Sequence, residues 1–142
     1  MNSTTVPSFV DTNVLVYAED SDAGDKRNRA RDLIVELWDS QDGVISVQVL
    51  QEFYVTVTRK LTKKMPSKKA SAIVEEYLAW RVIDNTAELL GSALRLHNDA
   101  RLSLWDALIV EAALDAGCDR LYTEDLNPGQ TFSSLVVVNP FL

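Results

Sequence analysis

Short apolar runs alternate with longer segments of helical periodicity along the chain. The runs are rich in Val, Ile, Leu and Phe, and each is short enough to be a strand. They cover residues 7–10, 44–46, 81–84, 120–123 and 135–138. Continuously apolar strands that alternate with helices are typical of a mainly parallel sheet covered on both faces. The pattern therefore predicts an α/β fold, a three-layer α/β/α domain with a mainly parallel central sheet of about five short strands.

The segments between these runs repeat apolar residues three and four positions apart, as amphipathic helices do. We expect helices over residues 12–18, 28–38, 67–80, 85–96 and 103–117. The fourth begins with a sequence that resembles a capping box, Asn85 followed by Glu88. Residues 47–58 are ambiguous, because their Val, Thr, Phe and Tyr content favours a strand. Their length and the spacing of Leu50 and Phe53 favour a helix, which is the expectation adopted.

The bulk properties fit one domain over residues 1–142, a length that can bury a single core. The net charge of −7 argues against a protein that coats nucleic acid in general. The chain has one cysteine, Cys118, and one histidine, His97, so it cannot form an intrachain disulfide or a thiolate metal cluster.

The sequence offers no segment for a membrane. Residues 1–5 lack the basic and long apolar regions of a signal peptide. The most apolar stretch, residues 104–114, is interrupted by Asp106 and Glu111 and is too short to span a bilayer. We expect a cytoplasmic protein without membrane contact.

Four acids stand where a parallel sheet would gather functional groups, near the carboxyl ends of strands. They are Asp11 after the first run, Glu52 about two turns beyond the second, Asp106 at the start of the most apolar helix, and Asp125 after the fourth run. Each has an ordinary alternative. Asp11 could cap the helix that begins at Thr12, and Asp106 could be the fourth member of a Ser103-x-x-Asp106 capping box. Glu52 could point outward, and Asp125 could belong to a turn. Glu52 and Asp106 are nonetheless flanked by core-type residues, where acids rarely lie without a partner.

Several acids gathered in one place need protons or a cation. Two carboxylates about 5 Å apart repel by roughly 3 kcal/mol at an effective dielectric constant near 20. Oxygen ligands without His or Cys select a hard ion such as Mg²⁺ or Mn²⁺. Such sites support the attack of a metal-activated water on a phosphodiester.

Five motifs in order along nearly the whole chain resemble the PIN-domain family, and more narrowly the virulence-associated protein C (VapC) type of toxin from bacterial toxin–antitoxin pairs. They are Val10-Asp11-Thr12-Asn13-Val14-Leu15, Ser46-x-x-x-Leu50-x-Glu52-Phe53, Trp105-Asp106-Ala107-x-Ile109, Tyr122-Thr123-Glu124-Asp125 and Val137-Val138-Asn139-Pro140-Phe141. The resemblance implies a Mg²⁺-dependent endoribonuclease, with Mn²⁺ as the alternative ion, and an α/β/α fold in which residues 47–58 are helical. It also implies a homodimer and a cognate antitoxin that occupies the acidic groove.

The resemblance assigns roles to individual residues. Asp11 and Asp106 would bind the metal, and Glu52 and Asp125 would complete the catalytic acids. Asn13, Ser46 and Thr123 match the polar positions that orient these carboxylates. The fourth acid is the least secure, because Glu124 stands beside Asp125. The family's Thr-x-Asp spacing favours Asp125.

A basic run could hold the RNA phosphates beside these acids. Six of the fourteen basic residues fall in eleven positions without an acid among them: Arg59, Lys60, Lys63, Lys64, Lys68 and Lys69. Lys63 and Lys64 are the candidate substrate-binding residues, and the alternative is a solvated loop. A second basic cluster comprises Lys26, Arg27, Arg29 and Arg31.

Three alternatives compete with a PIN-domain ribonuclease. A phosphoacceptor signalling domain would need paired acids after the first strand, whereas Asp11 is single, and an acceptor loop after the third, whereas Asn and Thr follow Asp84. A PIN-like module that binds RNA or protein without cleavage would be expected to lack one or more of the four acids. A nuclease acting on DNA is a further alternative.

Overall fold

The computed structural model describes residues 6–142. Residues 1–5 belong to the single domain expected over residues 1–142 and carry the expectation about a signal peptide. They lie outside the described residues. A six-stranded sheet forms the centre, with the strand order β3-β2-β1-β4-β6-β5. The strands are β1 (Ser8–Val10), β2 (Gly43–Ser46), β3 (Arg81–Ile83), β4 (Arg120–Tyr122), β5 (Thr131–Phe132) and β6 (Leu135–Val138). Every neighbouring pair is parallel except β5 and β6.

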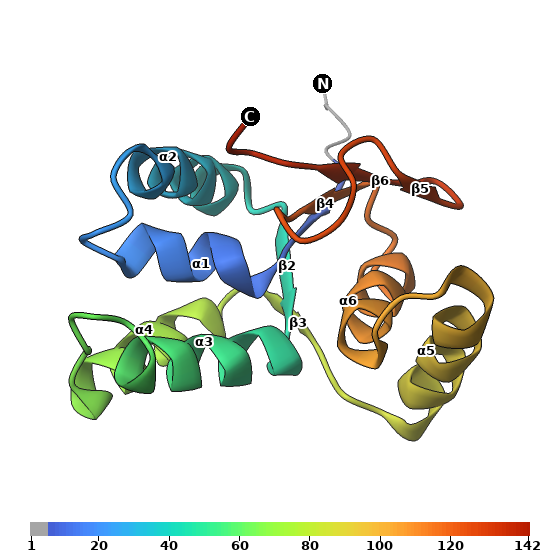
Figure 1. The fold of residues 1–142 in the computed structure, drawn as a ribbon, viewed down its shortest axis with the longest axis horizontal. Helices are drawn as coiled ribbons and strands as arrows, with labels where there is room; N and C mark the ends of the chain where they lie inside the picture. Colours follow the sequence, from blue (N-terminus) through green and yellow to red (C-terminus); the bar gives the residue numbers. More distant parts are fainter. Residues whose placement is uncertain (1–5) are drawn as a thin grey trace.

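Six helices cover the sheet in the described part of the chain. They are α1 (Thr12–Glu19), α2 (Asp25–Ser40), α3 (Val47–Arg59), α4 (Ser67–Tyr77), α5 (Ala87–Ala100) and α6 (Leu104–Asp115). Figure 1 shows α1 to α4 on one side of the strands and α5 and α6 on the other. The three-layer α/β/α arrangement with a mainly parallel sheet, expected from the alternation of strands and helices, is confirmed. None of the helices in residues 6–142 combines the length and the apolar character needed to cross a membrane.

The sheet differs from the expectation of about five strands by one short strand, β5, which pairs antiparallel with β6. Residues 131–132 are too few to show the alternating pattern from which a strand can be predicted. The helix expected over residues 47–58 is confirmed as α3, although its β-branched content favours a strand. Its apolar stripe is buried at Val49, Phe53 and Val57, and this tertiary packing outweighs the intrinsic propensity.

Helix boundaries differ from the expectation by a few residues, as terminal positions commonly do. Helix α2 begins earlier, at Asp25, and α4 ends earlier, at Tyr77. The residue that caps α5 is Thr86, not Asn85, because the Thr86 side chain accepts a hydrogen bond from the backbone N–H of Leu89 at 3.0 Å. The capping box expected at Asn85 and Glu88 is therefore wrong by one position.

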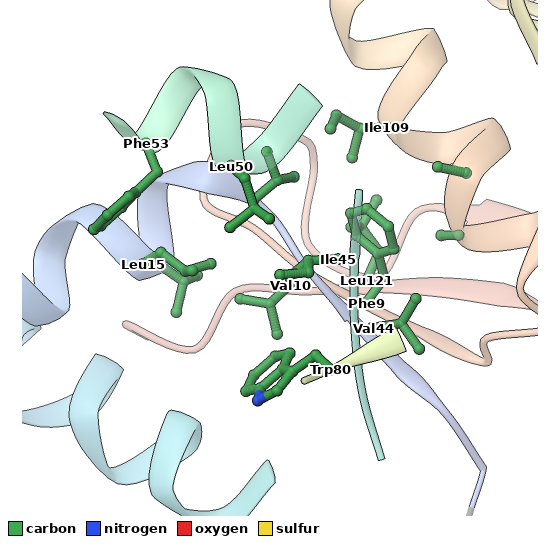
Figure 2. Packing of buried hydrophobic residues seen from close by; sticks show 14 of the residues in the cluster. Phe9, Val10, Leu15, Val44, Ile45, Leu50, Phe53, Trp80, Ile109 and Leu121 are labelled. Atoms are coloured by element: carbon green, nitrogen blue, oxygen red, sulfur yellow. The ribbon is translucent and has the colours of Figure 1, made fainter. Parts of the chain in front are cut away.

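The core lies between the sheet and both helical layers. Figure 2 shows Leu15, Leu50 and Phe53 reaching the strands from α1 and α3, while Ile109 approaches from α6. Trp80, before β3, lies against Gly43 in β2 so closely that a Cβ at this glycine would meet its ring at 2.5 Å. A glycine is therefore required where the indole packs on the strand.

The connections create one point at which the strand order reverses. From β1 the chain first adds β2 and β3 on one side of the sheet, then returns through α5 and α6 to add β4 on the other side. The carboxyl ends of β1 and β4 therefore flank a crevice that no connection crosses. In open parallel sheets this is the place where ligands bind.

Candidate active site

The crevice brings the ends of β1 and β4 side by side, with Val10 opposite Tyr122 in the parallel register. The backbone N–H of Asp11 continues the pairing by donating to the carbonyl oxygen of Tyr122 at 3.0 Å. Asp11 and Thr123 are the next residues on their strands, so their side chains meet at the carboxyl edge. The proximity follows from the register of the sheet, although 112 positions separate them in sequence.

Asp11 has two structural roles at this edge. It is the N-cap of α1, and its Oδ1 accepts a hydrogen bond from the backbone N–H of Thr12 at 2.7 Å. Its Oδ2 accepts from the Thr123 hydroxyl at 2.9 Å. The side chain is only 5 % exposed. Burial is the main cause that raises the pKa of Asp11 from 3.8 to about 7; the hydrogen bonds from Thr12 and Thr123 oppose this rise, and the charges of Asp125 and Glu52 contribute to it.

Thr123 is the centre of the hydrogen-bond network behind Asp11. Its hydroxyl donates to Asp11 and accepts from Asn13 Nδ2 and from the backbone N–H of Asp125, both at 3.0 Å. A hydroxyl has one donor and two acceptor sites, so these three bonds use its full capacity. Thr123 is completely buried, which makes the loss of any of these bonds costly.

Asn13 connects the first turn of α1 to the segment after β4. Its Nδ2 lies 3.1 Å from Asp125 Oδ2, and its Oδ1 accepts a hydrogen bond from the backbone N–H of Glu124 at 3.4 Å. Asn13 and Thr123 thus contact two of the four candidate acids, Asp11 and Asp125.

Glu52 reaches the same crevice from α3. Its Oε1 accepts from the Thr12 hydroxyl at 3.1 Å and from Gln48 Nε2 at 3.4 Å. Gln48 lies one turn before Glu52 and also donates to the backbone oxygen of Trp105 at 3.3 Å. One amide therefore links α3 to the first turn of α6.

Ser46, expected among the polar residues that orient the carboxylates, caps α3. Its Oγ accepts from the backbone N–H of Val49 at 3.2 Å. Ser46 is 1 % exposed and does not line the cavity formed by the acids. Its contribution to the position of Glu52 is therefore through the helix that it begins.

Asp106 lies in the first turn of α6. Ser103 is the N-cap of that helix, and its hydroxyl accepts from the backbone N–H of Asp106 at 3.0 Å. The Asp106 backbone N–H therefore makes the hydrogen bond to Ser103 that a capping box contains. The Asp106 residue also lines the cavity. Burial raises the pKa of Asp106, the side chain of Ser103 opposes this, and the charge of Asp125 adds to it.

The four acids line one cavity of about 370 Å³. They come from four different parts of the fold, with Asp11 after β1, Glu52 on α3, Asp106 on α6 and Asp125 after β4. A fifth acid, Asp20 at the end of α1, also lines it. The remaining lining residues are Thr12, Asn13, Val16, Tyr17, Gln48, Thr56, Leu61, Trp105 and Ile109.

Glu124, the competing fourth acid, does not line the cavity. Its carboxylate lies 2.8 Å from Lys26 Nζ and accepts a hydrogen bond from the Tyr17 hydroxyl. Although partial burial raises the pKa of Glu124, the bonds from Lys26 and Tyr17 outweigh it and lower that pKa below its ordinary value. Lys26, from the second basic cluster of the sequence, thus neutralises the acid beside Asp125.

The donor set of the cavity matches a hard cation, but the ligands are not assembled. All candidate ligands are carboxylate, hydroxyl or amide oxygens, the donors that Mg²⁺ and Mn²⁺ prefer. The buried Asp11 carboxylate, with its raised pKa, would gain most from a positive charge. Within residues 6–142, however, no three His, Cys, Asp or Glu side chains are arranged to hold a metal ion.

The basic run begins near the cavity. Thr56 and Leu61, which precede Lys63 and Lys64, line the cavity, whereas these two lysines do not. Lys63 Nζ lies 3.8 Å from Asp22 Oδ1, and both side chains are largely exposed. Exposed ion pairs of this kind contribute little to stability, so Lys63 could exchange this partner for a phosphate.

Sequence reasoning missed several residues of the cavity, above all Thr12, Asp20, Gln48 and Trp105. Two of them could have been found from the sequence, because Thr12 is next to Asp11 and Gln48 lies one helical turn before Glu52. Asp20 could not, since it stands in a polar loop after α1, where acids are common.

These features define a class: a three-layer α/β/α domain with an acidic cavity at the topological switch point of its parallel sheet. The chain belongs to the PIN-domain family, whose model, described as PIN domain, matches residues 8–131.

Solved structures share the fold at low sequence identity. VapC20 from Mycobacterium tuberculosis, described as a toxin that cleaves the Sarcin-Ricin loop, is 23 % identical with a TM-score of 0.63, covering 82 % of this chain and 90 % of that one. A toxin–antitoxin complex from Klebsiella pneumoniae is 20 % identical with a TM-score of 0.69, covering 94 % and 97 %. VapBC2 from Rickettsia felis, bound to a DNA fragment from its promoter, is 20 % identical with a TM-score of 0.62, covering 92 % and 96 %. No curated protein sequence matches the chain.

Proposed function

We propose that this PIN domain is a metal-dependent endoribonuclease and the toxin of a toxin–antitoxin pair. The observation that carries the proposal is the convergence of Asp11, Glu52, Asp106 and Asp125, from four separate parts of the fold, on one cavity. Membership of the PIN-domain family supports a nuclease. The similar structures support a toxin, since one is described as a Sarcin-Ricin loop cleaving toxin and another as a toxin–antitoxin complex.

In this proposal Asp11 and Asp106 hold Mg²⁺, or Mn²⁺ in its place, and Glu52 and Asp125 complete the acidic site. When bound, the ion would acidify a water molecule and stabilise the charge that develops on the leaving oxygen of the phosphodiester. The chain's own contribution is to orient the carboxylates. Thr12 and Gln48 hold Glu52, while Thr123 and Asn13 hold Asp11 and Asp125. Supporting hydrogen bonds of this kind orient metal ligands and strengthen their hold on the ion.

The partners follow from the same proposal. The substrate is RNA, and Lys63 and Lys64 bind its phosphates beside the cavity. The cognate partner is an antitoxin protein, a proposal supported by the toxin–antitoxin complexes among the similar structures. The homodimer and the cytoplasmic location remain predictions that come from the resemblance and from the sequence.

A cleavage assay tests the proposed activity. Purified protein is incubated with labelled single-stranded RNA and with DNA of the same sequence, in Mg²⁺, in Mn²⁺ and in excess EDTA, beside Asp11→Asn as the matched control. We expect RNA cleavage only with metal and only by the unsubstituted protein. Equal cleavage in EDTA would overturn the metal dependence, and cleavage of DNA alone would replace RNA as the substrate. If the protein bound RNA but cleaved it under none of these conditions, it would be an RNA-binding PIN module without catalytic activity.

A further inference from the structure

Trp105 stands out among the aromatic residues of the described chain. It is 63 % exposed, whereas Trp38 is 38 % and Trp80 is 8 % exposed. The other two tryptophans pack against each other at a centroid distance of 5.5 Å, and both contact Tyr77. Within residues 6–142 the Trp105 ring takes part in no aromatic pair or cation–π contact. Most of its apolar surface therefore lies in water.

The exposed indole lies at the acidic cavity. Trp105 lines the cavity together with Asp106, its neighbour in the first turn of α6. The backbone oxygen of Trp105 accepts a hydrogen bond from Gln48 Nε2, and the same amide contacts Glu52. The backbone that carries the indole is thus tied to two of the candidate acids.

The cavity lining has two chemical characters. Five acids supply carboxylates, and Val16, Leu61, Trp105 and Ile109 supply apolar surface. A nucleotide has the matching division, since its phosphate seeks the cation held by carboxylates and its base has an apolar face. An aromatic side chain stacks on any base, because every base has a π-face. An apolar helix of a protein partner would fit an acidic lining less well, since it would desolvate the carboxylates without pairing them.

We propose that the indole of Trp105 stacks on a nucleobase next to the phosphate that enters the acidic cavity. Trp105 is then a substrate-binding residue that selects unpaired nucleotides, because a base inside a duplex does not offer its face. This inference rests on the proposed nuclease function, and it names the strand state of its substrate.

Binding is measured separately from cleavage, in the Asp11→Asn background with Mg²⁺ present. A short single-stranded oligoribonucleotide is titrated against Trp105, Trp105→Phe and Trp105→Ala. We expect Trp105→Ala to weaken binding roughly 5- to 150-fold, the range of one lost stacked base, and Trp105→Phe to retain most of the affinity. Leu90→Ala is the matched control, because Leu90 is an exposed apolar residue that does not line the cavity. It should bind like the background protein.

A set of oligoribonucleotides with one abasic position moved along the strand identifies the stacked base. At one position along the strand, the abasic site should weaken binding to the protein that has Trp105. The same abasic oligoribonucleotide should bind Trp105→Ala no more weakly than the intact strand does. Tryptophan fluorescence should be quenched by the intact strand, and this quenching should be lost in Trp105→Ala. In the enzyme with Asp11, Trp105→Ala should raise KM and leave kcat almost unchanged. A thermal melt close to that of the unsubstituted protein confirms that the variant is folded.

Failure of the inference and failure of the proposed function look different. RNA cleavage by the unsubstituted protein, with the same KM and RNA affinity in Trp105→Ala, would overturn stacking and keep the nuclease. Trp105-dependent, base-dependent binding without any cleavage would keep stacking and overturn the nuclease. Absence of RNA binding by every form of the protein would overturn both the stacking and the nuclease. If Trp105→Ala weakened the binding of a protein partner and not of RNA, stacking would be overturned.

Discussion

The Thr123 hydroxyl donates a 2.9 Å hydrogen bond to Asp11 Oδ2, in a place where neither side chain has more than 5 % of its surface exposed. The bond spans the two adjacent strands β1 and β4 at the switch point of the sheet. Because Thr123 also accepts from Asn13 and from the backbone of Asp125, one hydroxyl links two of the four acids of the cavity, Asp11 and Asp125.

Replacement of Thr123 by Val removes that hydroxyl and keeps the side-chain shape. We expect the free energy of unfolding to fall by about 1–3 kcal/mol, because buried polar groups lose their partner. RNA cleavage should fall by roughly 10- to 100-fold, as is typical when the residue that orients a metal ligand is lost. Thr123→Ser is the control and should restore most of both. Normal cleavage by folded Thr123→Val would show that the hydroxyl does not orient the acids.

A pair of variants distinguishes the role of Asp106 as a metal ligand from its role in the cap of α6. We expect Asp106→Asn to abolish RNA cleavage in Mg²⁺, because the proposal makes this carboxylate a metal ligand. Ser103→Ala removes the cap hydroxyl of the same helix and should cost about 0.5–2 kcal/mol of stability while cleavage stays within a few-fold. Cleavage assays and thermal melts of both variants separate the two roles. If Asp106→Asn cut RNA normally, the metal role of Asp106 would be wrong.

Asp11 makes a prediction about the pH dependence of stability. Its pKa is about 7 in the folded protein and 3.8 ordinarily, so between these pH values the folded state keeps a proton that the unfolded state has lost. Stability from this group therefore falls by about 1.4 kcal/mol for each pH unit as pH rises through that window, and is constant above it. In EDTA, Asp11→Asn should melt near the unsubstituted protein at pH 4 and above it at pH 8. A melting difference independent of pH would contradict the raised pKa.

The acids after β4 are distinguished by a pair of variants. Asp125→Asn should greatly reduce RNA cleavage, because Asp125 lines the cavity, whereas Glu124→Gln should retain it. Glu124→Gln should instead weaken the contacts with Lys26 and Tyr17 and lower the melting temperature slightly. The reverse pattern of cleavage would identify Glu124 as the fourth acid.

Lys63 and Lys64 are tested through the salt dependence of RNA binding. Each lost phosphate contact should lower the slope of log affinity against log salt by roughly 0.7, so Lys63→Ala with Lys64→Ala should lower it by about 1.4. Cleavage at saturating RNA should change little, because phosphate contacts position the strand. Arg95→Ala, which removes an exposed charge on α5 in the other helical layer, should leave the slope unchanged. A slope that also stays unchanged in the double lysine variant would indicate a solvated loop.

The layered α/β/α fold could be predicted from the sequence, because the period of the apolar residues indicates which faces of the helices and strands are buried. The sequence also marked Asp11, Glu52, Asp106 and Asp125, since acids at strand ends and beside core residues stand out locally. It did not reveal β5, whose two residues carry no pattern, or the Thr86 cap, which lies one position from an equally suitable Asn.

Which side chains contact one another in the site follows from the three-dimensional packing of the chain. Asp125 and Glu124 are adjacent in sequence and chemically alike, and the difference between them comes from Asn13 and Thr123 on one side and from Lys26 and Tyr17 on the other. Gln48 and Trp105 likewise became part of the site because α3 and α6 meet at the crevice. Such contacts join residues far apart in the chain, so they depend on sheet register and helix packing, which local periodicity does not encode.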